Sequence, residues 1–170
     1  MLRVGIGFDA HRFGKKRKLF LGGVEIPSEK GLVGHSDADV LLHALGDAML
    51  GAAGLGDLGT HFPDTDPGWE GAASSVFIRK ILAMLRRKHF RLLNVDVTVV
   101  AQTPKIAPHR SVILESLSQL LGLSKDAINL KATTTDSMGF IGRKEGIAAQ
   151  AIVLIEKRHK DTKTQRKQKT

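Results

Sequence analysis

SDADVLLHALGDAMLGAA, residues 36–53, is the stretch that decides the fold. Its apolar residues recur every three to four positions, as on one face of a helix: Leu41, Leu45, Ala48, Met49 and Ala52. Ser36 and Asp37 are residue types that cap helix N-termini, so we expect the helix to open at this pair. The stretch therefore predicts a helix from Ser36 to about Ala53.

The segments on either side alternate between strand and helix patterns. Further helices are expected around residues 77–85 and 113–121. Strands are expected at 2–8, at 19–27 as two short strands around Gly22-Gly23, and at 95–100, 128–133 and 151–156. Strands and helices interleave without strict alternation, which predicts the α+β class. We expect a single domain with a mixed four- to five-stranded sheet and helices on one face.

A long irregular segment, GLGDLGTHFPDTDPGWEG (54–71), follows the first helix. It is rich in Gly, Pro and Asp and has no period. Such a segment is too long for a plain connection in a compact domain and is typical of binding loops and lids. We expect it to cover a site.

Composition limits the chemistry. The chain has 170 residues and no cysteine, so a transition-metal site must use His and carboxylate ligands. No apolar run approaches the roughly 20 residues that cross a bilayer, and the N-terminus does not resemble a signal peptide. We expect a soluble, cytoplasmic protein without a membrane partner.

Most of the net charge of +9 lies at the C-terminal end. Residues 157–170, KRHKDTKTQRKQKT, hold seven Lys/Arg and one Asp, against 19 basic and 16 acidic residues elsewhere. A segment without apolar residues cannot offset its ordering entropy, so we expect a folded domain at 1–156 and a disordered, solubilising tail at 157–170. The nearly neutral domain lacks the basic face typical of nucleic-acid binding.

Candidate metal ligands lie on the first strand and the first helix. Asp9 and His11 are two residues apart, so their side chains point to the same side. Asp39, His43 and Asp47 share one helix face. Taken alone, a pair such as Asp9 and His11 is more often a hydrogen-bonded surface pair than a metal site. The Asp39, His43 and Asp47 set, taken alone, fits a solvated helix face as well as it fits a functional site. Together, Asp9, His11 and His43 form a three-ligand set with an open position, as in catalytic zinc sites, with Asp39 or Asp47 orienting the His43 ring.

One sequence pattern suggests a dinucleotide-binding site, but the residues that follow it do not fit. Gly5-Ile6-Gly7-Phe8-Asp9-Ala10 fits the dinucleotide-binding pattern G-x-G-x-x-G/A after a strand. That pattern requires a following helix whose N-terminus binds the pyrophosphate. Here the basic segment HRFGKKRKLFLGG (11–23) follows and leads into the expected hairpin, so hydride chemistry is not indicated.

A second polar cluster is KATTTDSMGFIGRKEG (131–146). Its threonines, glycines and arginine supply hydroxyls, open backbone N–H groups and a forked cation, which suit phosphate binding. A Thr-rich strand end with a flexible turn explains the composition equally well. A third segment, AQTPKIAPH (101–109), reads by itself as an ordinary loop.

Four blocks together resemble a known family: FDAH (8–11), GHSDADVLLHALGDAMLGAAGLGDLGTHFPDTDP (34–67), NVDVTVVAQTPK (94–105) and KATTTDSMGFIGRKEG (131–146). In order and separation they are similar to the 2-C-methyl-D-erythritol 2,4-cyclodiphosphate synthases of non-mevalonate isoprenoid biosynthesis, over residues 2 to 156. The resemblance implies a cyclising phosphorus–oxygen lyase that releases CMP from 4-diphosphocytidyl-2-C-methyl-D-erythritol 2-phosphate. The substrate's 2-phosphate attacks the β-phosphorus, so the protein positions groups and neutralises charge.

The resemblance also implies roles for single residues. The Asp9, His11 and His43 set matches the family's zinc ligands. His35 and Thr134 match the two positions that stabilise the transition state. Asp136 matches the carboxylate of a second divalent cation, magnesium or manganese.

Other positions match substrate-binding residues. They are Asp57 and Gly59 at the ribose with Leu58 between them; Phe62, Pro63, Asp64, Thr65 and Asp66 in a mobile loop over the methylerythritol part; Ala101, Gln102, Thr103, Pro104, Lys105, Ile106 and Ala107 at the cytosine and phosphates; and Thr133 and Thr135 beside Thr134.

The family is a homotrimer with active sites between subunits. The resemblance thus implies that the cytidine pocket and the zinc site come from different chains. Phe8, Phe140 and Arg143 match positions near a central cavity that can hold an isoprenoid diphosphate.

Three residues depart from the family pattern. Asp136 stands where many members have Glu, which weakens the expected contact with the second cation or makes it water-mediated. Lys144 replaces a common Gly, and Gln150 replaces a frequent acid. Both change the charge around the central cavity.

Two other classes of function remain open from the sequence. A nucleic-acid-binding module acting through the tail predicts strongly salt-dependent binding that is lost on deleting residues 157–170. A zinc hydrolase predicts attack by a metal-bound water in place of the substrate's phosphate.

Overall fold

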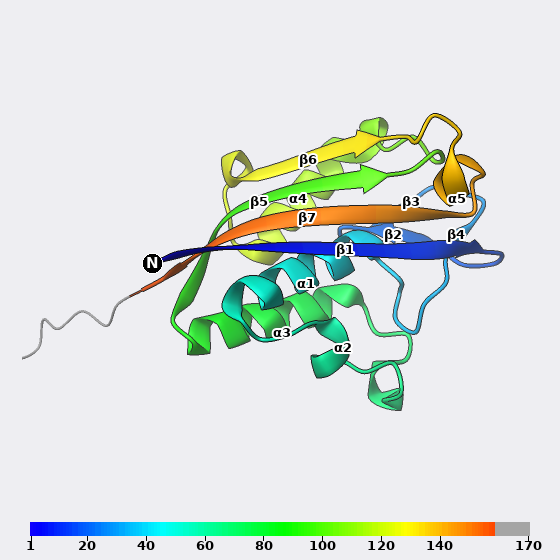
Figure 1. Cartoon of the computed structure of the whole chain (residues 1–170). Coiled ribbons are helices and arrows are strands. Elements are labelled where there is room, and N and C mark those ends of the chain that lie inside the picture. The colour runs from blue at the N-terminus through cyan, green and yellow to red at the C-terminus, as the bar shows by residue number, and fades with distance from the viewer. Residues whose placement is uncertain (159–170) are drawn as a thin grey trace, which may run out of the picture.

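A computed structural model describes residues 1–158, and its central feature is a five-stranded mixed sheet (Figure 1). The strand order is β4-β1-β7-β5-β6. β5 and β6 are parallel, and the other neighbouring strands are antiparallel. The strands are β1 (Leu2–Gly14), β4 (Gly31–Leu32), β5 (Phe90–Val100), β6 (Ile128–Thr133) and β7 (Gly146–Lys157). This confirms the predicted single-domain α+β class with a mixed sheet.

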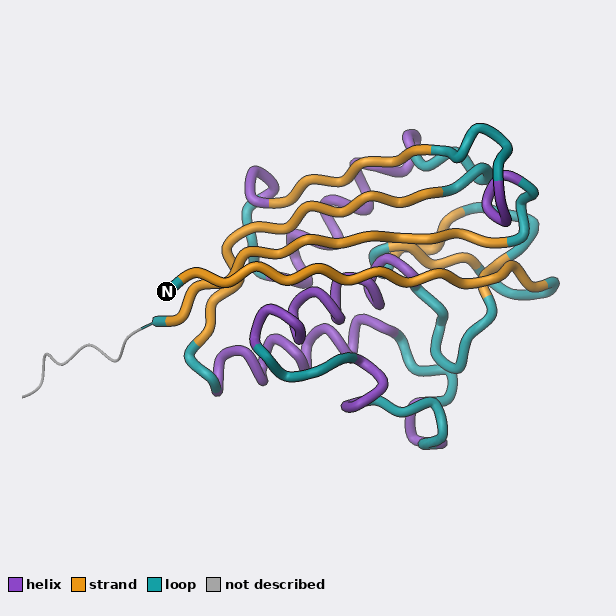
Figure 2. Tube along the Cα trace, in the orientation of Figure 1, coloured by secondary structure: helices purple, strands orange, loops and turns teal. Residues whose placement is uncertain are grey.

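The three long helices lie on one face of this sheet, as Figures 1 and 2 show. The three long helices are α1 (Val40–Ala53), α3 (Ser74–Arg87) and α4 (Arg110–Leu121). The short ones are α2 (Leu58–His61), α5 (Gly139–Gly142) and the 3-10 turns η1 (Pro67–Trp69), η2 (Ala107–His109) and η3 (Lys125–Ala127). Apolar residues of α1, α3, α4 and the inner face of the sheet form one buried core.

The close packing of α1 on β1 explains the glycines of the first strand. A Cβ added to Gly5 or Gly7 would lie 2.0 Å from the backbone oxygen of Ala48 or Ala44, respectively. β1 continues past Gly7 as a strand to Gly14. These glycines therefore allow the backbone of α1 to approach β1 closely. Because a strand follows them, and not the helix that a dinucleotide site requires, the structure agrees with the rejection of that site.

The predicted hairpin is present as a separate two-stranded sheet. β2 (Leu19–Leu21) pairs with β3 (Val24–Ile26), and Gly22 and Gly23 turn with φ values of 64° and 79°. Such positive φ values favour glycine. The carboxylate of Asp39 accepts hydrogen bonds from both glycine N–H groups, at 3.0 and 2.6 Å, which ties the hairpin to the start of α1.

The start of the first helix differs from the expectation. Asp39 is the N-cap of α1 and accepts a hydrogen bond from the Leu42 N–H at 3.0 Å, so the opening expected at Ser36 and Asp37 is wrong. Those two side chains have other partners: Ser36 accepts from the Ala38 N–H, and Asp37 accepts from the Ser74 N–H at 3.1 Å. The predicted irregular segment 54–71 also contains α2 and η1.

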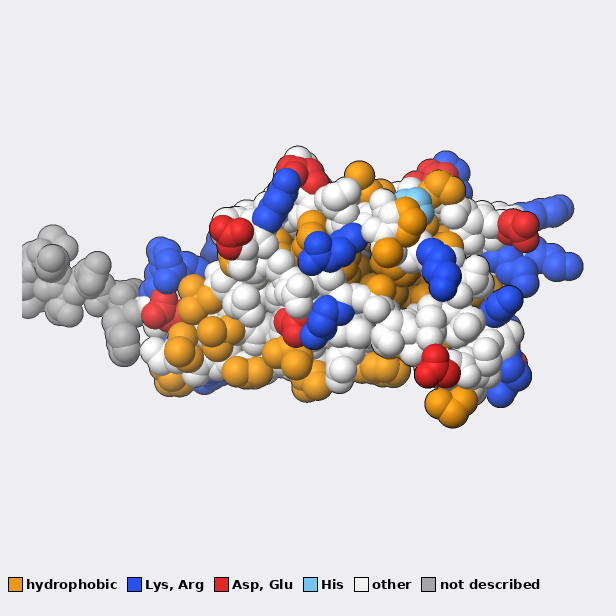
Figure 3. All heavy atoms as spheres, turned by 90° about the horizontal axis from the view of Figure 1, so that it is seen from above, with side chains coloured by type: hydrophobic (Ala, Val, Ile, Leu, Met, Phe, Trp, Pro, Cys, Tyr) orange, Lys and Arg blue, Asp and Glu red, His pale blue; other side chains and the backbone are white. Residues whose placement is uncertain are grey.

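The opposite face of the sheet carries an exposed apolar stripe, made of Leu2, Val4, Ile6 and Phe8 of β1 and Ile152 of β7. These side chains are between 43% and 68% exposed, and Ile6 pairs in register with Ile152. Figure 3 shows hydrophobic side chains along its lower edge, which is the side facing the viewer in Figure 1. Within the described residues, this sheet face has no helical layer over it.

Two backbone hydrogen bonds hold the end of β7 against neighbouring segments. The Lys157 N–H donates to the Met1 carbonyl at 2.9 Å, and the Arg158 N–H donates to the His89 carbonyl at 2.8 Å. Of the tail expected at 157–170, Lys157 is thus the last residue of β7 and Arg158 is hydrogen-bonded, while residues 159–170 lie outside the described residues. Among residues 1–158, no helix combines the length and apolarity that a bilayer crossing requires.

Candidate metal centre

Three side chains converge between β1 and α1. Oδ2 of Asp9 lies 2.9 Å from Nε2 of His11 and 3.1 Å from Nδ1 of His43, and the two ring nitrogens are 3.0 Å apart. Ligands bound about 2.0 Å from a zinc ion are separated by roughly 3.3 Å along a tetrahedral edge. The three atoms thus have nearly the mutual spacing of a ligand triangle, and the group can hold a metal ion.

A backbone carbonyl fixes the state of the His11 ring. Nδ1 of His11 lies 3.0 Å from the Val33 carbonyl oxygen. A carbonyl only accepts hydrogen bonds, so Nδ1 carries the proton and donates it. Nε2 is therefore left with a free lone pair that points at the ligand triangle.

Two serine hydroxyls hold the His43 ring. Nε2 of His43 lies 3.1 Å from Oγ of Ser36 and 3.0 Å from Oγ of Ser74. The Ser74 hydroxyl donates to Oδ1 of Asp37, so its oxygen is free to accept from Nε2–H of His43. This chain of hydrogen bonds leaves Nδ1 of His43 as the ligand atom.

The expectation that Asp39 or Asp47 orients His43 is therefore wrong. Asp39 is fully buried as the cap of α1, and burial raises its pKa despite its backbone hydrogen bonds. Asp47 accepts a hydrogen bond from the Leu58 N–H at 2.8 Å, which attaches α2 to α1; burial raises its pKa as well. The two acids hold the surrounding framework, while the serines contact the ring.

The charges around the ligand triangle favour the ionised form of Asp9. Burial raises the pKa of Asp9, but hydrogen bonds and attraction from His11 and His43 outweigh burial and hold the pKa below its ordinary value. Burial lowers the pKa of His11, but the carboxylate of Asp9 outweighs it and raises the pKa above 6.5. Asp9 thus stays a carboxylate and attracts a cation, so a proton on His11 and a metal ion compete for this position.

The triangle opens into a cavity of about 460 Å³, within the range of small-molecule sites. His35 lines it beside the two ligand histidines, and its Nε2 lies 3.2 Å from the Asp66 carbonyl oxygen. Three aromatic residues form one wall: Phe62 stacks on Phe77 with ring centroids 4.8 Å apart, and Trp69 meets Phe62 edge-on with centroids 5.4 Å apart. The cavity therefore combines an apolar wall with imidazole groups.

Several residues predicted from the 54–71 segment meet the metal centre at this cavity. Leu58, Gly59, Phe62, Pro63 and Asp64 line it. Asp57 caps α2 by accepting from the N–H and hydroxyl of Thr60, and Asp66 caps η1. Thr65 lies exposed between Asp64 and Asp66.

The other predicted residues lie elsewhere in the chain. Ala101, Gln102, Thr103, Pro104, Lys105, Ile106 and Ala107 follow β5, and Thr133, Thr134, Thr135, Asp136, Phe140 and Arg143 lie at and beyond the end of β6. The cavity at the metal centre contains none of them. β7 lies between β1 and β5, and residues of the 101–107 segment line other pockets in the same chain.

Local contacts order the Thr-rich turn. Oγ1 of Thr134 lies 3.3 Å from Oδ1 of Asp136, whose φ is 49°. Nε of Arg143 donates to Glu145 at 2.7 Å. In the 101–107 segment, Oε1 of Gln102 is a buried oxygen without a hydrogen-bond partner among the described residues.

Sequence reasoning missed the side chains that support the centre. Ser74 and Ser36 hold His43, Asp37 holds Ser74, and Trp69 and Phe77 form the cavity wall. The sequence signals were weak: Ser36 and Asp37 looked like a helix cap, and Phe77 like an ordinary core residue of α3. A lone tryptophan within a polar loop was the one available indication of a packed wall.

Comparisons with known proteins agree over nearly the whole chain. The sequence matches the YgbB family over residues 2–156. It is 53% identical over 157 residues to "2-C-methyl-D-erythritol 2,4-cyclodiphosphate synthase" of Methylobacillus flagellatus, covering 92% of this chain and 98% of that protein.

Solved structures show the same fold. One, "Structure of 2C-Methyl-D-erythritol-2,4-cyclodiphosphate Synthase (bound form CDP)", has a TM-score of 0.84 and 40% identity, covering 91% of this chain and 100% of its own. The "IspF (Plasmodium falciparum) CDP complex" has a TM-score of 0.81 and 33% identity, covering 93% and 97%. With a family match across the entire folded domain, this chain belongs to the YgbB family, the cyclising lyases known as 2-C-methyl-D-erythritol 2,4-cyclodiphosphate synthases.

Proposed function

We propose that the chain converts 4-diphosphocytidyl-2-C-methyl-D-erythritol 2-phosphate to 2-C-methyl-D-erythritol 2,4-cyclodiphosphate and CMP. One observation carries the proposal: the Asp9, His11 and His43 triangle opens into the same cavity as His35 and the loop around Pro63. Relatives of this name share about half of the sequence, and two similar structures are CDP complexes.

In this reaction one bond forms as another breaks. An oxygen of the 2-phosphate bonds to the β-phosphorus, and the bond from that phosphorus to the oxygen of the CMP phosphate breaks. CMP leaves with the bridging oxygen, and no water is consumed. The protein therefore needs no covalent nucleophile and acts by positioning and charge neutralisation.

Zinc suits the donor set of two imidazole nitrogens and one carboxylate oxygen, and when bound it supplies positive charge that orients and polarises the diphosphate. The residues of the chain do the rest. In the complex, the Nε2–H of His35 exchanges the Asp66 carbonyl for an oxygen of a reacting phosphate, and the Thr134 hydroxyl donates to the other side. Asp136 would hold a second cation, magnesium or manganese, which would supply positive charge for the departing CMP.

The substrate-binding residues divide into two sets in this proposal. Asp57, Leu58 and Gly59 hold the ribose, and residues 62–66 close over the methylerythritol part. Residues 101–107 hold the cytosine and phosphates, with Thr133 and Thr135 beside them. The sets lie apart in one chain, which supports an active site shared by neighbouring subunits.

A homotrimer supplies that arrangement. The apolar stripe of Leu2, Val4, Ile6, Phe8 and Ile152 is a contiguous exposed surface of the kind that marks protein–protein contacts. Burying it between copies supports trimer formation through the bare sheet face. Phe8, Phe140 and Arg143 then face the central cavity, where an isoprenoid diphosphate binds in this proposal.

His43→Ala tests the proposal at its centre. Removing one ligand of three should abolish CMP release and lower the zinc content measured by elemental analysis. His61→Ala is the control, because His61 binds the Leu55 carbonyl at 2.7 Å and lies outside the cavity. Full zinc content and turnover in His43→Ala would refute both the ligand assignment and the mechanism.

A further inference from the structure

A pocket lined by arginines lies at the far end of the sheet from the metal centre. It has a volume of about 400 Å³ between the end of α3 and the start of β5. Arg86, Arg91, Arg158 and His89 line it, and Leu82 and Leu92, which are 8% and 7% exposed, contribute a small apolar surface. No residue of the predicted substrate site belongs to it.

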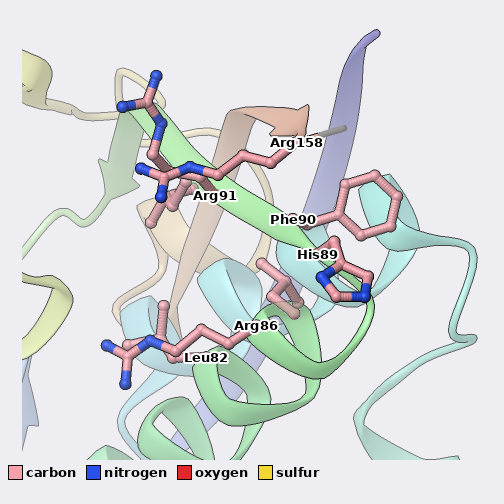
Figure 4. Close-up of a pocket in the computed structure, with 8 residues that line it drawn as sticks. Leu82, Arg86, His89, Phe90, Arg91 and Arg158 are labelled. Atoms are coloured by element: carbon pink, nitrogen blue, oxygen red, sulfur yellow. The ribbon is translucent and has the colours of Figure 1, made fainter. Parts of the chain in front are cut away.

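The three arginine side chains extend in the same direction, from two rims of the pocket. Figure 4 shows Arg91 and Arg158 on one rim and Arg86 on the other, whereas Phe90 points to the opposite side. The ring of Phe90 is already covered by Arg3 and Lys157, whose charged groups lie 5.1 and 5.7 Å from its centroid. The open part of the pocket is therefore bounded by the arginines, by His89 and by the small exposed parts of Leu82 and Leu92.

The positive charge at this pocket is only partly balanced. Arg91 donates to Glu156 at 2.9 Å. Among residues 1–158, neither Arg86 nor Arg158 forms an ion pair with a carboxylate, and no acidic residue lines the pocket. Like charges so placed repel one another, and an anion that accepts hydrogen bonds from both rims removes that repulsion.

The chain's own C-terminal sequence does not match this pocket in charge. The residues after Arg158, HKDTKTQRKQKT, include five Lys/Arg and one Asp. Their net charge has the same sign as the pocket. The charge pattern thus favours an external anion over the chain's own end.

The pocket is separate from the proposed active site. Leu2 pairs with Glu156, and Asp9 pairs with Ala149. Seven strand residues correspond to roughly 23 Å along β1. A ligand here therefore does not take part in the cyclisation itself.

We infer that this arginine pocket binds a small organic phosphate. The guanidinium forks of Arg86 and Arg158 hold the phosphate, because a planar fork matches its oxygens. A short apolar group of the ligand lies against Leu82 and Leu92. The ligand thus combines a phosphate, which matches the arginines, with an apolar group, which matches the leucines.

Hexyl phosphate is a suitable probe, with the zinc-loaded, full-length protein and amide chemical shifts as the readout. Saturable shifts are expected at residues 82–92, with weaker binding of inorganic phosphate and no binding of hexanol. The double variant Arg86→Gln, Arg158→Gln should bind about tenfold more weakly or worse, because it loses two charge-assisted contacts. Arg91 is left unchanged so that Glu156 keeps its partner.

Arg79→Gln is the matched control, since Arg79 is an exposed arginine of α3 outside this pocket. It should leave hexyl phosphate binding unchanged. An absence of saturable shifts at 82–92, equal affinity in the double variant, or shifts confined to residues 34–36 at the metal centre would overturn the inference. Equal binding of inorganic phosphate would overturn the assignment of the apolar part.

Discussion

Oγ of Ser74 lies 3.0 Å from Nε2 of His43, and the hydroxyl of this serine is held in turn by Asp37. Ser74 is fully buried and begins α3, whereas His43 lies on α1. The contact between two helices thus decides which nitrogen of His43 is free. A framework of hydrogen bonds sets the ligand geometry before any metal arrives.

Ser74→Ala should lower zinc affinity by about 10- to 100-fold, because the His43 ring loses the partner that fixes its tautomer. A competition titration against a chelator measures the change. Ser75→Ala is the matched control, since Ser75 is the next residue of α3 and its hydroxyl contacts Arg79 instead. Equal zinc affinity in Ser74→Ala and the wild type would show that Ser36 alone orients the ring.

The pH dependence of stability should differ between the metal-free and zinc-bound protein. In the metal-free protein Asp9 raises the pKa of His11 above 6.5, so the folded state holds this proton more tightly than the unfolded state. The stabilisation is fully present below pH 6.5 and is lost as the pH rises through the folded pKa. Denaturant unfolding of the metal-free protein should therefore show this loss, and His11→Ala should remove it.

Zinc reverses the sign of that dependence. The metal binds the neutral His11 ring, so protons compete with it, and zinc stabilisation increases with pH over the same range. Unfolding curves with and without zinc, measured across the pKa of His11, test this directly. Parallel pH dependences in the two forms would contradict a shared site for the proton and the metal.

Gly7→Ala should destabilise the fold strongly. The new Cβ would lie 2.0 Å from the Ala44 oxygen, so α1 would have to move away from β1, at a cost of about 2–4 kcal/mol or more. Gly51→Ala is the control on α1 itself. Its Cβ meets nothing closer than 4.0 Å, so higher helix propensity should stabilise the protein by about 0.5–1 kcal/mol. Equal unfolding midpoints for the two variants would contradict the packing described.

Ile6→Asp tests the proposed assembly. A charge in the middle of the apolar stripe would be desolvated between subunits, so the variant should sediment as a monomer while the wild type sediments as a trimer. Val112→Asp is the control, because Val112 is 49% exposed on α4, away from the stripe. A wild-type chain that sediments as a monomer at assay concentrations would rule out a shared active site.

Periodicity predicted much of the fold, and the failures have local causes. The helix around Leu45 and the strand at 95–100 are present because one apolar face is enough to define each. β1 extends six residues beyond its predicted end at Phe8, because pairing with β4 and β7 continues through polar residues such as Arg12. Such pairing is tertiary and leaves no apolar alternation in the sequence.

The residues of the candidate site were likewise predicted only in part. Spacing made Asp9, His11 and His43 a plausible three-ligand set, because two of them share a strand side and the third lies on a polar helix stripe, and the resemblance assigned them to zinc. The partners of His43 were not predicted, since Ser74 is 31 residues away and meets the ring only after α1 and α3 pack. Roles for residues 101–107 came from the resemblance alone, whereas the composition of 131–146 had suggested phosphate binding and an ordinary turn equally.

The most direct test of the central claim is phosphorus NMR of the products. The zinc-loaded protein, with magnesium present, is incubated with 4-diphosphocytidyl-2-C-methyl-D-erythritol 2-phosphate. We predict that CMP and a cyclic diphosphate appear together in equal amounts. Formation of linear phosphates alone would contradict the account, because it would mean that water, and not the substrate's 2-phosphate, attacks the β-phosphorus.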